Sequence, residues 1–186
     1  MQMNVVFLDY DGVVNTPRWV TETDENGVTK RHVKYNWPSD EKVNDEDAVQ
    51  WVCEFCEKFD YKIVISSTWR RYKNYVSCLK NAGLRDDIEV IGRTNVYGDG
   101  DRNREISDYL SDHTEIENYL IFDDEDFFYG DDLHDHLILC DPSHGFKCTE
   151  FEKAIDMHNK FVREKNREEY EVCADSSKRT WEHDRL

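Results

Sequence analysis

One stretch near the start of the chain decides the fold: Asn4-Val-Val-Phe-Leu-Asp9-Tyr-Asp-Gly-Val13. It is a short apolar run that stops at an acidic turn containing a glycine. A run of this length predicts a strand that is buried on both faces, as in a parallel sheet. Ligands of such sheets bind beyond the carboxyl ends of the strands, so Asp9 and Asp11 are candidate site residues.

The rest of the chain continues this alternation of strands and helices. Apolar runs predict further strands over 62–66, 88–91, 119–122 and 137–140, and helical spacing predicts helices over 45–59, 70–82, 104–111 and from a Thr149–Glu152 capping box onward. This order predicts an α/β fold with a three-layer, Rossmann-like parallel sheet. Two β-prone runs around Asp24-Glu-Asn-Gly27 predict a hairpin over about 18–35. No insertion is long enough to form a large cap domain.

Composition and charge limit the kinds of protein that this chain can be. Its 186 residues are 38% hydrophobic and 35% charged, which is typical of a globular protein. We expect one domain over 1–162 and a charged tail over 163–186, a frayed helix or disordered, because apolar residues thin out there. The formal net charge of −17 repels polyanions at long range and disfavours a generic nucleic-acid coat protein.

The sequence also bears on location. No apolar run approaches the ~18–20 residues that span a bilayer. Met1 leads directly into the first predicted strand, with no basic region typical of a signal peptide. We therefore expect a cytoplasmic protein without a membrane partner.

Polar residues that could together bind a metal ion and a phosphate lie at the ends of several predicted strands and at the start of one predicted helix. They are Asp9 and Asp11 after the first strand, Ser66 and Ser67 after the next strand of the α/β core, Arg102 and Arg104 before a helix, and Asp123 and Asp124 after the strand over 119–122. Carboxylates gathered at one sheet edge repel one another unless a hard cation such as Mg²⁺ lies among them. One carboxylate can attack phosphorus, and a second can protonate the leaving oxygen and then activate water. A hydroxyl and a cation can neutralise the phosphoryl oxygens.

These motifs resemble those of the haloacid dehalogenase-like (HAD) phosphatase superfamily. The first matches its DxDG(T/V) motif, and Ile63-Val-Ile-Ser66 matches its strand that ends in Ser or Thr. Ser66-Ser-Thr-Trp-Arg70, Arg102-x-x-Glu105-Ile106 and Asp141-Pro-Ser-His-Gly-Phe146 are similar, more narrowly, to the small, nearly capless HAD domains associated with "Swiss Army knife" RNA-repair proteins. The resemblance extends over about 3–162 and implies a HAD fold with a hairpin flap.

The resemblance implies a role for each candidate residue. Asp9 would be the nucleophile and a metal ligand, and Asp11 would be the acid/base, with its carbonyl on the metal. Ser66 would hold the phosphoryl group, and Arg102 would stabilise its charge. Asp123 and Asp124 would be the remaining ligands of Mg²⁺. Ser67 and Arg104 compete for two of these roles. Ser66 is favoured because it closes the strand, and Arg102 because it lies three residues before Glu105-Ile106.

The substrate is less well defined by the sequence. Ser67, Arg70 and Arg104 are candidate substrate-binding residues, and a basic collar comprises Arg70, Arg71, Lys73, Arg93, Arg102 and Arg104, with Trp69 and Tyr72 nearby. The collar suits a nucleotide or the 5′ or 3′ phosphate of a nucleic-acid end. A phosphorylated small molecule is the other candidate partner, and the sequence indicates no stable protein partner. The same cations could instead pair with surface carboxylates. A phosphotransferase or mutase, and a catalytically silent binding module, remain alternative functions.

Overall fold

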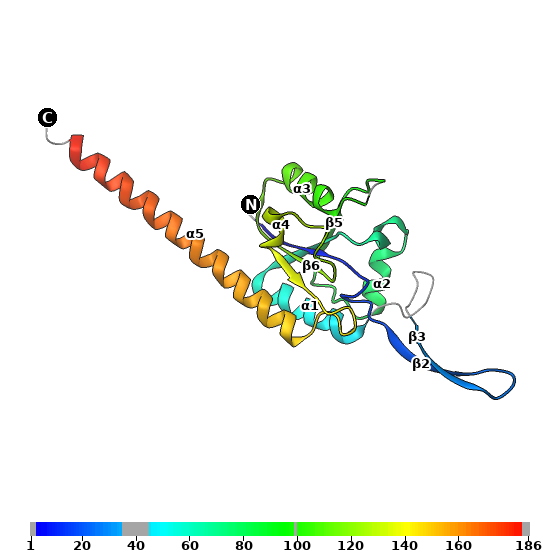
Figure 1. Cartoon of the computed structure of the whole chain (residues 1–186). Helices are drawn as coiled ribbons and strands as arrows, with labels where there is room; N and C mark the ends of the chain where they lie inside the picture. Colours follow the sequence, from blue (N-terminus) through cyan, green and yellow to red (C-terminus); the bar gives the residue numbers. More distant parts are fainter. Residues whose placement is uncertain (1–2, 35–44, 99, 184–186) are drawn as a thin grey trace.

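Five parallel strands form the central sheet of the computed structural model (Figure 1), which describes residues 3–34, 45–98 and 100–183. The strands are β1 (Met3–Leu8), β4 (Tyr61–Ile65), β5 (Val90–Arg93), β6 (Ile116–Asp123) and β7 (Leu137–Leu139). Their order is β5-β4-β1-β6-β7, so β1 is central, with β4 on one side and β6 on the other. The predicted α/β fold with a parallel sheet is therefore confirmed. In the described ranges no large cap domain interrupts it.

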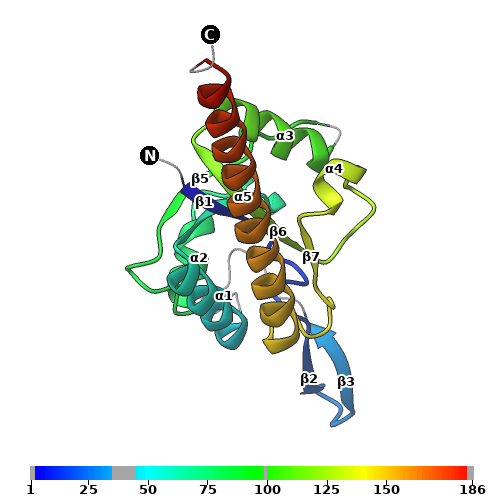
Figure 2. The same cartoon turned by 90° about the vertical axis from the view of Figure 1, so that its left-hand side faces the viewer.

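Helices cover both faces of this sheet (Figure 2). They are α1 (Glu46–Phe59), the 3-10 turn η1 (Thr68–Arg71), α2 (Tyr75–Asn81), α3 (Arg102–Asp112), α4 (Asp131–His134) and α5 (Cys148–His183). Side chains alternate along β1, so Val6 and Leu8 join the core with α1, α2 and α5, whereas Val5 and Phe7 join the core with α3 and α4. The four apolar residues from Val5 to Leu8 are fully buried on both faces of the sheet, as the apolar run predicts.

The first helix shows how local sequence sets an element. Asp45 caps α1, because its carboxylate accepts the backbone N–H groups of Asp47 and Ala48. The same carboxylate accepts the Thr16 hydroxyl at 2.9 Å and the Lys147 ammonium at 3.1 Å. One residue thus connects the loop after β1, the start of α1 and the segment that leads into α5.

Two local expectations are corrected. The helix expected over 70–82 is divided into η1 and α2, because the Arg70 side chain bonds back to the Ser66 and Ser67 carbonyls and tightens the first turn. The predicted Thr149–Glu152 capping box is displaced: the carboxylate of Glu150 accepts the Lys147 N–H at 3.3 Å. Glu150 then occupies the third helical position relative to Lys147, which is the place where a capping-box acid acts.

The predicted hairpin and the last helix both project from the body of the protein. The hairpin is present as β2 (Arg18–Thr23) and β3 (Thr29–Lys34), and it points away from the body in both views (Figures 1 and 2); Tyr35 lies outside the described residues. Helix α5 continues to His183, and its second half projects beyond the body (Figure 1). Among the helices of the described chain, none is long and apolar enough to span a bilayer.

Candidate active site

Three carboxylates meet at the carboxyl ends of β1 and β6. Oxygen atoms of Asp9, Asp123 and Asp124 all lie within 4.8 Å of one another. Parallel pairing brings the first two together, because the Asp9 N–H donates to the Phe122 carbonyl at 3.0 Å. Asp124 can approach because residue 12 is glycine: its φ is 72°, and a Cβ there would collide with the Asp124 carboxylate.

The crowding of these carboxylates changes their titration. Burial, and then the charge of Asp9, raise the pKa of Asp123 to about 7. Burial and Asp9 likewise raise the pKa of Asp124 to about 6. Negative charge at this point exceeds what the protein neutralises, which is the environment that a divalent cation with oxygen ligands requires. The three carboxylates therefore fit the Mg²⁺ that the sequence motifs imply.

Arg102 is the arginine that reaches this cluster. It is the first residue of α3, and its Nη1 lies 2.8 Å from Asp123 Oδ2 and 3.4 Å from Asp9 Oδ1. Burial lowers the pKa of Arg102, but the charges of Asp9 and Asp123 outweigh burial and raise the pKa overall. Arg104 is half exposed; its guanidinium lies 4.1 Å from the centre of the Tyr97 ring, and its Nε lies 3.7 Å from an Asp108 oxygen. Of the two arginines in competition, only Arg102 contacts the carboxylates.

The two serines after β4 are in different situations. The Ser66 N–H donates to the Leu8 carbonyl at 3.0 Å, which places this residue beside the end of β1. Its hydroxyl is buried and has no hydrogen-bond partner among the described residues. The Ser67 hydroxyl accepts the Trp69 N–H at 3.3 Å and caps η1. The Ser66 hydroxyl is thus the one left available for a ligand oxygen.

The Asp11 carboxylate is held by two neutral donors and lies outside the carboxylate cluster. The Trp69 indole Nε1 donates to Oδ2 at 2.9 Å, and the Asn15 amide donates to Oδ1 at 2.5 Å. Burial raises the pKa of Asp11; these two hydrogen bonds oppose the rise and the charge of Asp9 adds to it, so the pKa is raised overall. A raised pKa suits a group that must donate a proton near neutral pH.

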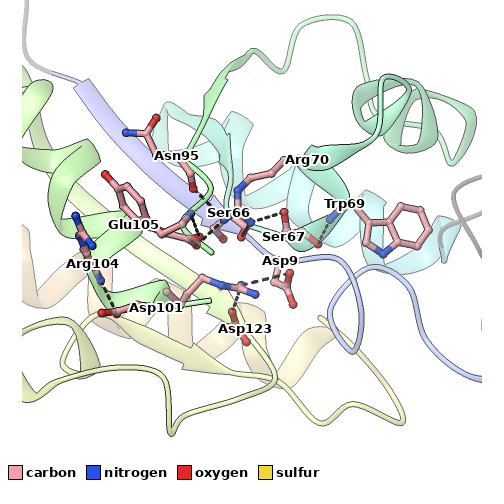
Figure 3. A network of polar contacts seen from close by, with 12 residues as sticks. Asp9, Ser66, Ser67, Trp69, Arg70, Asn95, Asp101, Arg104, Glu105 and Asp123 are labelled. Carbon is pink, nitrogen blue, oxygen red and sulfur yellow. Dashed lines mark hydrogen bonds and ion pairs between the residues drawn. The ribbon is translucent and has the colours of Figure 1, made fainter. Parts of the chain in front are cut away.

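The placement of Arg70 differs from the expected one. Its side chain is buried, and Nη1 donates to the Ser66 and Ser67 carbonyls at 2.5 and 2.6 Å. Nη2 donates to the Asn95 carbonyl at 3.0 Å and pairs with Glu105 (Figure 3). A guanidinium with these contacts lies inside the protein, so Arg70 is not part of a surface collar. The neighbouring Arg71 and Lys73 are exposed.

Several contacts of the site were not predicted from the sequence. The Tyr129 hydroxyl donates to Asp123 Oδ2 at 2.6 Å, and no motif marks this tyrosine. Trp69 and Glu105 lie within the sequence motifs, and Asn15 lies two residues after the first motif, but only the structure gives their partners. The Phe146 N–H donates to the Val13 carbonyl at 2.8 Å, so the loop that precedes α5 packs on the loop that follows β1.

The strand order and the groups at the strand ends define a HAD-like α/β domain. The chain belongs to the family described as the HAD domain in Swiss Army Knife RNA repair proteins, which it matches over residues 5–151. The matched region includes all the candidate site residues from Asp9 to Asp124. No curated protein matches the chain. Membership of this family supports a function of the HAD phosphatase type.

Proposed function

We propose that the protein is a Mg²⁺-dependent phosphomonoester hydrolase that acts through an aspartyl-phosphate on Asp9. The observation that carries this proposal is the position of Asp9. Its carboxylate lies close to two further acids, Asp123 and Asp124, and 3.4 Å from the guanidinium of Arg102. A nucleophile that must approach a phosphate dianion needs this combination of cation ligands and a fixed positive charge.

The metal ligands would be the carboxylates of Asp9, Asp123 and Asp124, together with the Asp11 carbonyl that the family resemblance implies. When bound, Mg²⁺ would neutralise charge on the phosphoryl oxygens and keep the Asp9 carboxylate ionised. Tyr129 would hold Asp123 in place, because its hydroxyl donates to Oδ2 while the Glu125 N–H donates to Oδ1 at 3.0 Å.

The reaction would proceed in two displacements on phosphorus. In the first, a carboxylate oxygen of Asp9 attacks phosphorus, the bond to the ester oxygen breaks, and Asp11 gives its proton to the departing alkoxide. In the second, Asp11 takes a proton from water, the hydroxide attacks the same phosphorus, and the bond to Asp9 breaks to release inorganic phosphate. The Ser66 hydroxyl and the Arg102 guanidinium would bind the equatorial oxygens in both steps.

The substrate that we propose is the phosphate of a nucleotide or of a nucleic-acid 5′ or 3′ end. The family description names RNA repair proteins. Arg71 and Lys73 are exposed a few residues after Ser66 and Ser67. They have no carboxylate partner in the part of the chain that the structure describes. These cations could bind phosphates that neighbour the reacting one. A phosphorylated small molecule is the alternative.

A substrate panel tests the proposal. We expect the full chain with Mg²⁺ to release phosphate from 5′- or 3′-phosphorylated oligonucleotides or nucleoside monophosphates, and to stop when EDTA is added. The Asp9→Asn protein is the matched control. A chain that binds these ligands but releases no phosphate from any of them would be a silent binding module. Transfer of the phosphoryl group to an added alcohol in preference to water would indicate a phosphotransferase.

A further inference from the structure

The turn that follows β6 is fixed to the proposed metal site at two points. The Glu125 N–H donates to Asp123 Oδ1 at 3.0 Å, and the Tyr129 hydroxyl donates to Asp123 Oδ2 at 2.6 Å. The turn itself is closed by the Tyr129 N–H, which donates to the Asp126 carbonyl at 3.2 Å. Its two central residues, Phe127 and Phe128, are therefore held at a constant position relative to Asp123.

These two phenylalanines connect the site to the surface. The Arg102 guanidinium lies over the half-buried Phe128 ring, 5.8 Å from its centre. The Phe127 ring contacts Phe128, with 4.1 Å between ring centres and a tilt of 38°. The Phe127 side is open to solvent, since this residue is 71% exposed, more than any other large apolar residue whose exposure the structure describes.

The exposure of Phe127 does not follow from the requirements of folding. Central positions of tight turns favour Gly, Pro, Asn and Asp, which supply the backbone geometry. A phenylalanine ring that remains in water contributes little to the core. Single exposed apolar residues are common on proteins, but this one is continuous with a proposed phosphate-binding arginine through one intervening ring.

The charges around Phe127 indicate which part of a ligand could lie on it. Glu125 and Asp126, two and one residues before it, are exposed acids. They would repel a phosphate placed beside the ring. An uncharged planar group has no such penalty and gains from stacking on the aromatic face. A nucleotide offers such a group, its base, attached through the sugar to the reacting phosphate.

We propose that Phe127 is a stacking platform for the base of the nucleotide that carries the scissile phosphate. This inference rests on the proposed phosphatase function and makes Phe127 a specificity-determining residue. It selects base-bearing phosphates over equivalent phosphates without a base. Purines, which have the larger ring surface, stack better on it than pyrimidines.

The test compares substrates that differ only in the base. The kcat/KM values are measured for adenosine 5′- and 3′-phosphates, the corresponding uridine phosphates, and ribose 5-phosphate. In Phe127→Ala we expect the ratio of adenosine phosphate to ribose phosphate to fall about tenfold, and the adenosine-to-uridine ratio to approach one. Phe127→Tyr should restore both ratios. Val162→Ala, an exposed apolar residue of α5, is the control and should keep the ratios of the unaltered protein.

Two results would overturn the inference. One is an unchanged ratio in Phe127→Ala. The other is a loss of the ratio in Tyr72→Ala instead, because Tyr72 is the 50% exposed aromatic residue that follows η1. Equilibrium binding of adenosine phosphates and ribose 5-phosphate to Asp9→Asn protein, with and without Phe127→Ala, separates this inference from the proposed function. A protein that never turns over can still show a tenfold loss of nucleotide binding on removal of the ring.

Discussion

Arg70 and Glu105 form a buried ion pair with 2.5 Å between Nη2 and Oε2. Arg70 also bonds to the carbonyl of Ser66, and Glu105 lies on α3 one turn after Arg102. The pair thus joins the loop that carries the candidate phosphate-binding hydroxyl to the helix that carries the candidate phosphate-binding cation. The buried pair therefore helps to set the distance between the Ser66 hydroxyl and the Arg102 guanidinium.

Removing the charge of Glu105 should destabilise the protein strongly. Glu105→Gln keeps the shape but leaves the Arg70 guanidinium buried without a counter-charge. Breaking a buried pair in this way costs about 3–5 kcal/mol, which urea unfolding can measure. Asp86→Asn, which breaks the exposed contact between Lys80 and Asp86, is the control and should change stability by less than about 1 kcal/mol. Equal effects of the two changes would contradict a structural role for the buried pair.

Asp9→Asn should abolish turnover while the protein stays folded. The substitution is nearly isosteric, and the amide can neither attack phosphorus nor ligate a metal as a charged group. We expect phosphate release to fall by at least about 10³-fold, with no decrease in the melting temperature, because one charge leaves a crowded cluster. A rate near that of the unaltered protein would exclude the covalent mechanism.

Stabilisation by Mg²⁺ should grow with pH. In the metal-free protein the pKa values of Asp123 and Asp124 are raised to about 7 and about 6, above the ~3.9 of an unfolded chain. The stability that these groups contribute is therefore fully present below pH ~4 and is lost as pH rises through 6 and 7. Mg²⁺ binds the deprotonated carboxylates and removes their repulsion. Melting temperatures with and without Mg²⁺ should differ more at pH 8 than at pH 5, and this dependence should weaken in Asp123→Asn.

Trp69→Phe should impair the acid/base step selectively. The change removes the indole N–H that holds Asp11 at 2.9 Å but retains an aromatic ring in a buried position. Alkyl phosphates, whose leaving oxygen needs a proton, should slow by about tenfold or more, whereas p-nitrophenyl phosphate should slow less. The control is Trp51→Phe, because Trp51 packs on Phe151, with 5.2 Å between the ring centres. A uniform loss on both ester types would mean that Trp69 serves only the fold.

Neutralising Arg71 and Lys73 should weaken the binding of phosphorylated oligonucleotides. Removing one cation that binds a phosphate should reduce the slope of log K against log salt by about 0.7 for single strands, and KM for p-nitrophenyl phosphate should change little. The control is the double variant Lys160→Ala with Arg163→Ala, which removes the same number of charges from α5. This part of α5 lies near the amino end of the sheet, because Lys165 pairs with Glu117 at the start of β6. If both double variants behave alike, the effect is one of net charge and the nucleic-acid substrate is contradicted.

The sequence predicted the parts of the site that depend on strand ends. Asp9 and Asp123 follow apolar runs, and parallel pairing of adjacent strands is enough to bring them together. Arg70 was wrongly predicted to lie in the surface collar, because an arginine that is buried by a distant partner has the same sequence pattern as an exposed one. Its partner Glu105 lies on α3, which follows β5. Tyr129 was missed because a hydroxyl that reaches back six residues to a carboxylate leaves no periodic pattern.

The central position of β1 has a consequence for the order in which the candidate site assembles during synthesis. Asp9 directly follows β1, whereas the two acids that cluster with it, Asp123 and Asp124, lie at and just after the end of β6. At 5–20 residues per second, roughly 6–23 s separate the synthesis of Asp9 from that of Asp124. During this interval the edge of β1 that later pairs with β6 has no partner from its own sheet, and a nascent chain that stalls there presents an open strand to neighbouring chains. Assembly of the carboxylate cluster and protection of this strand edge from aggregation therefore occur together, when β6 docks.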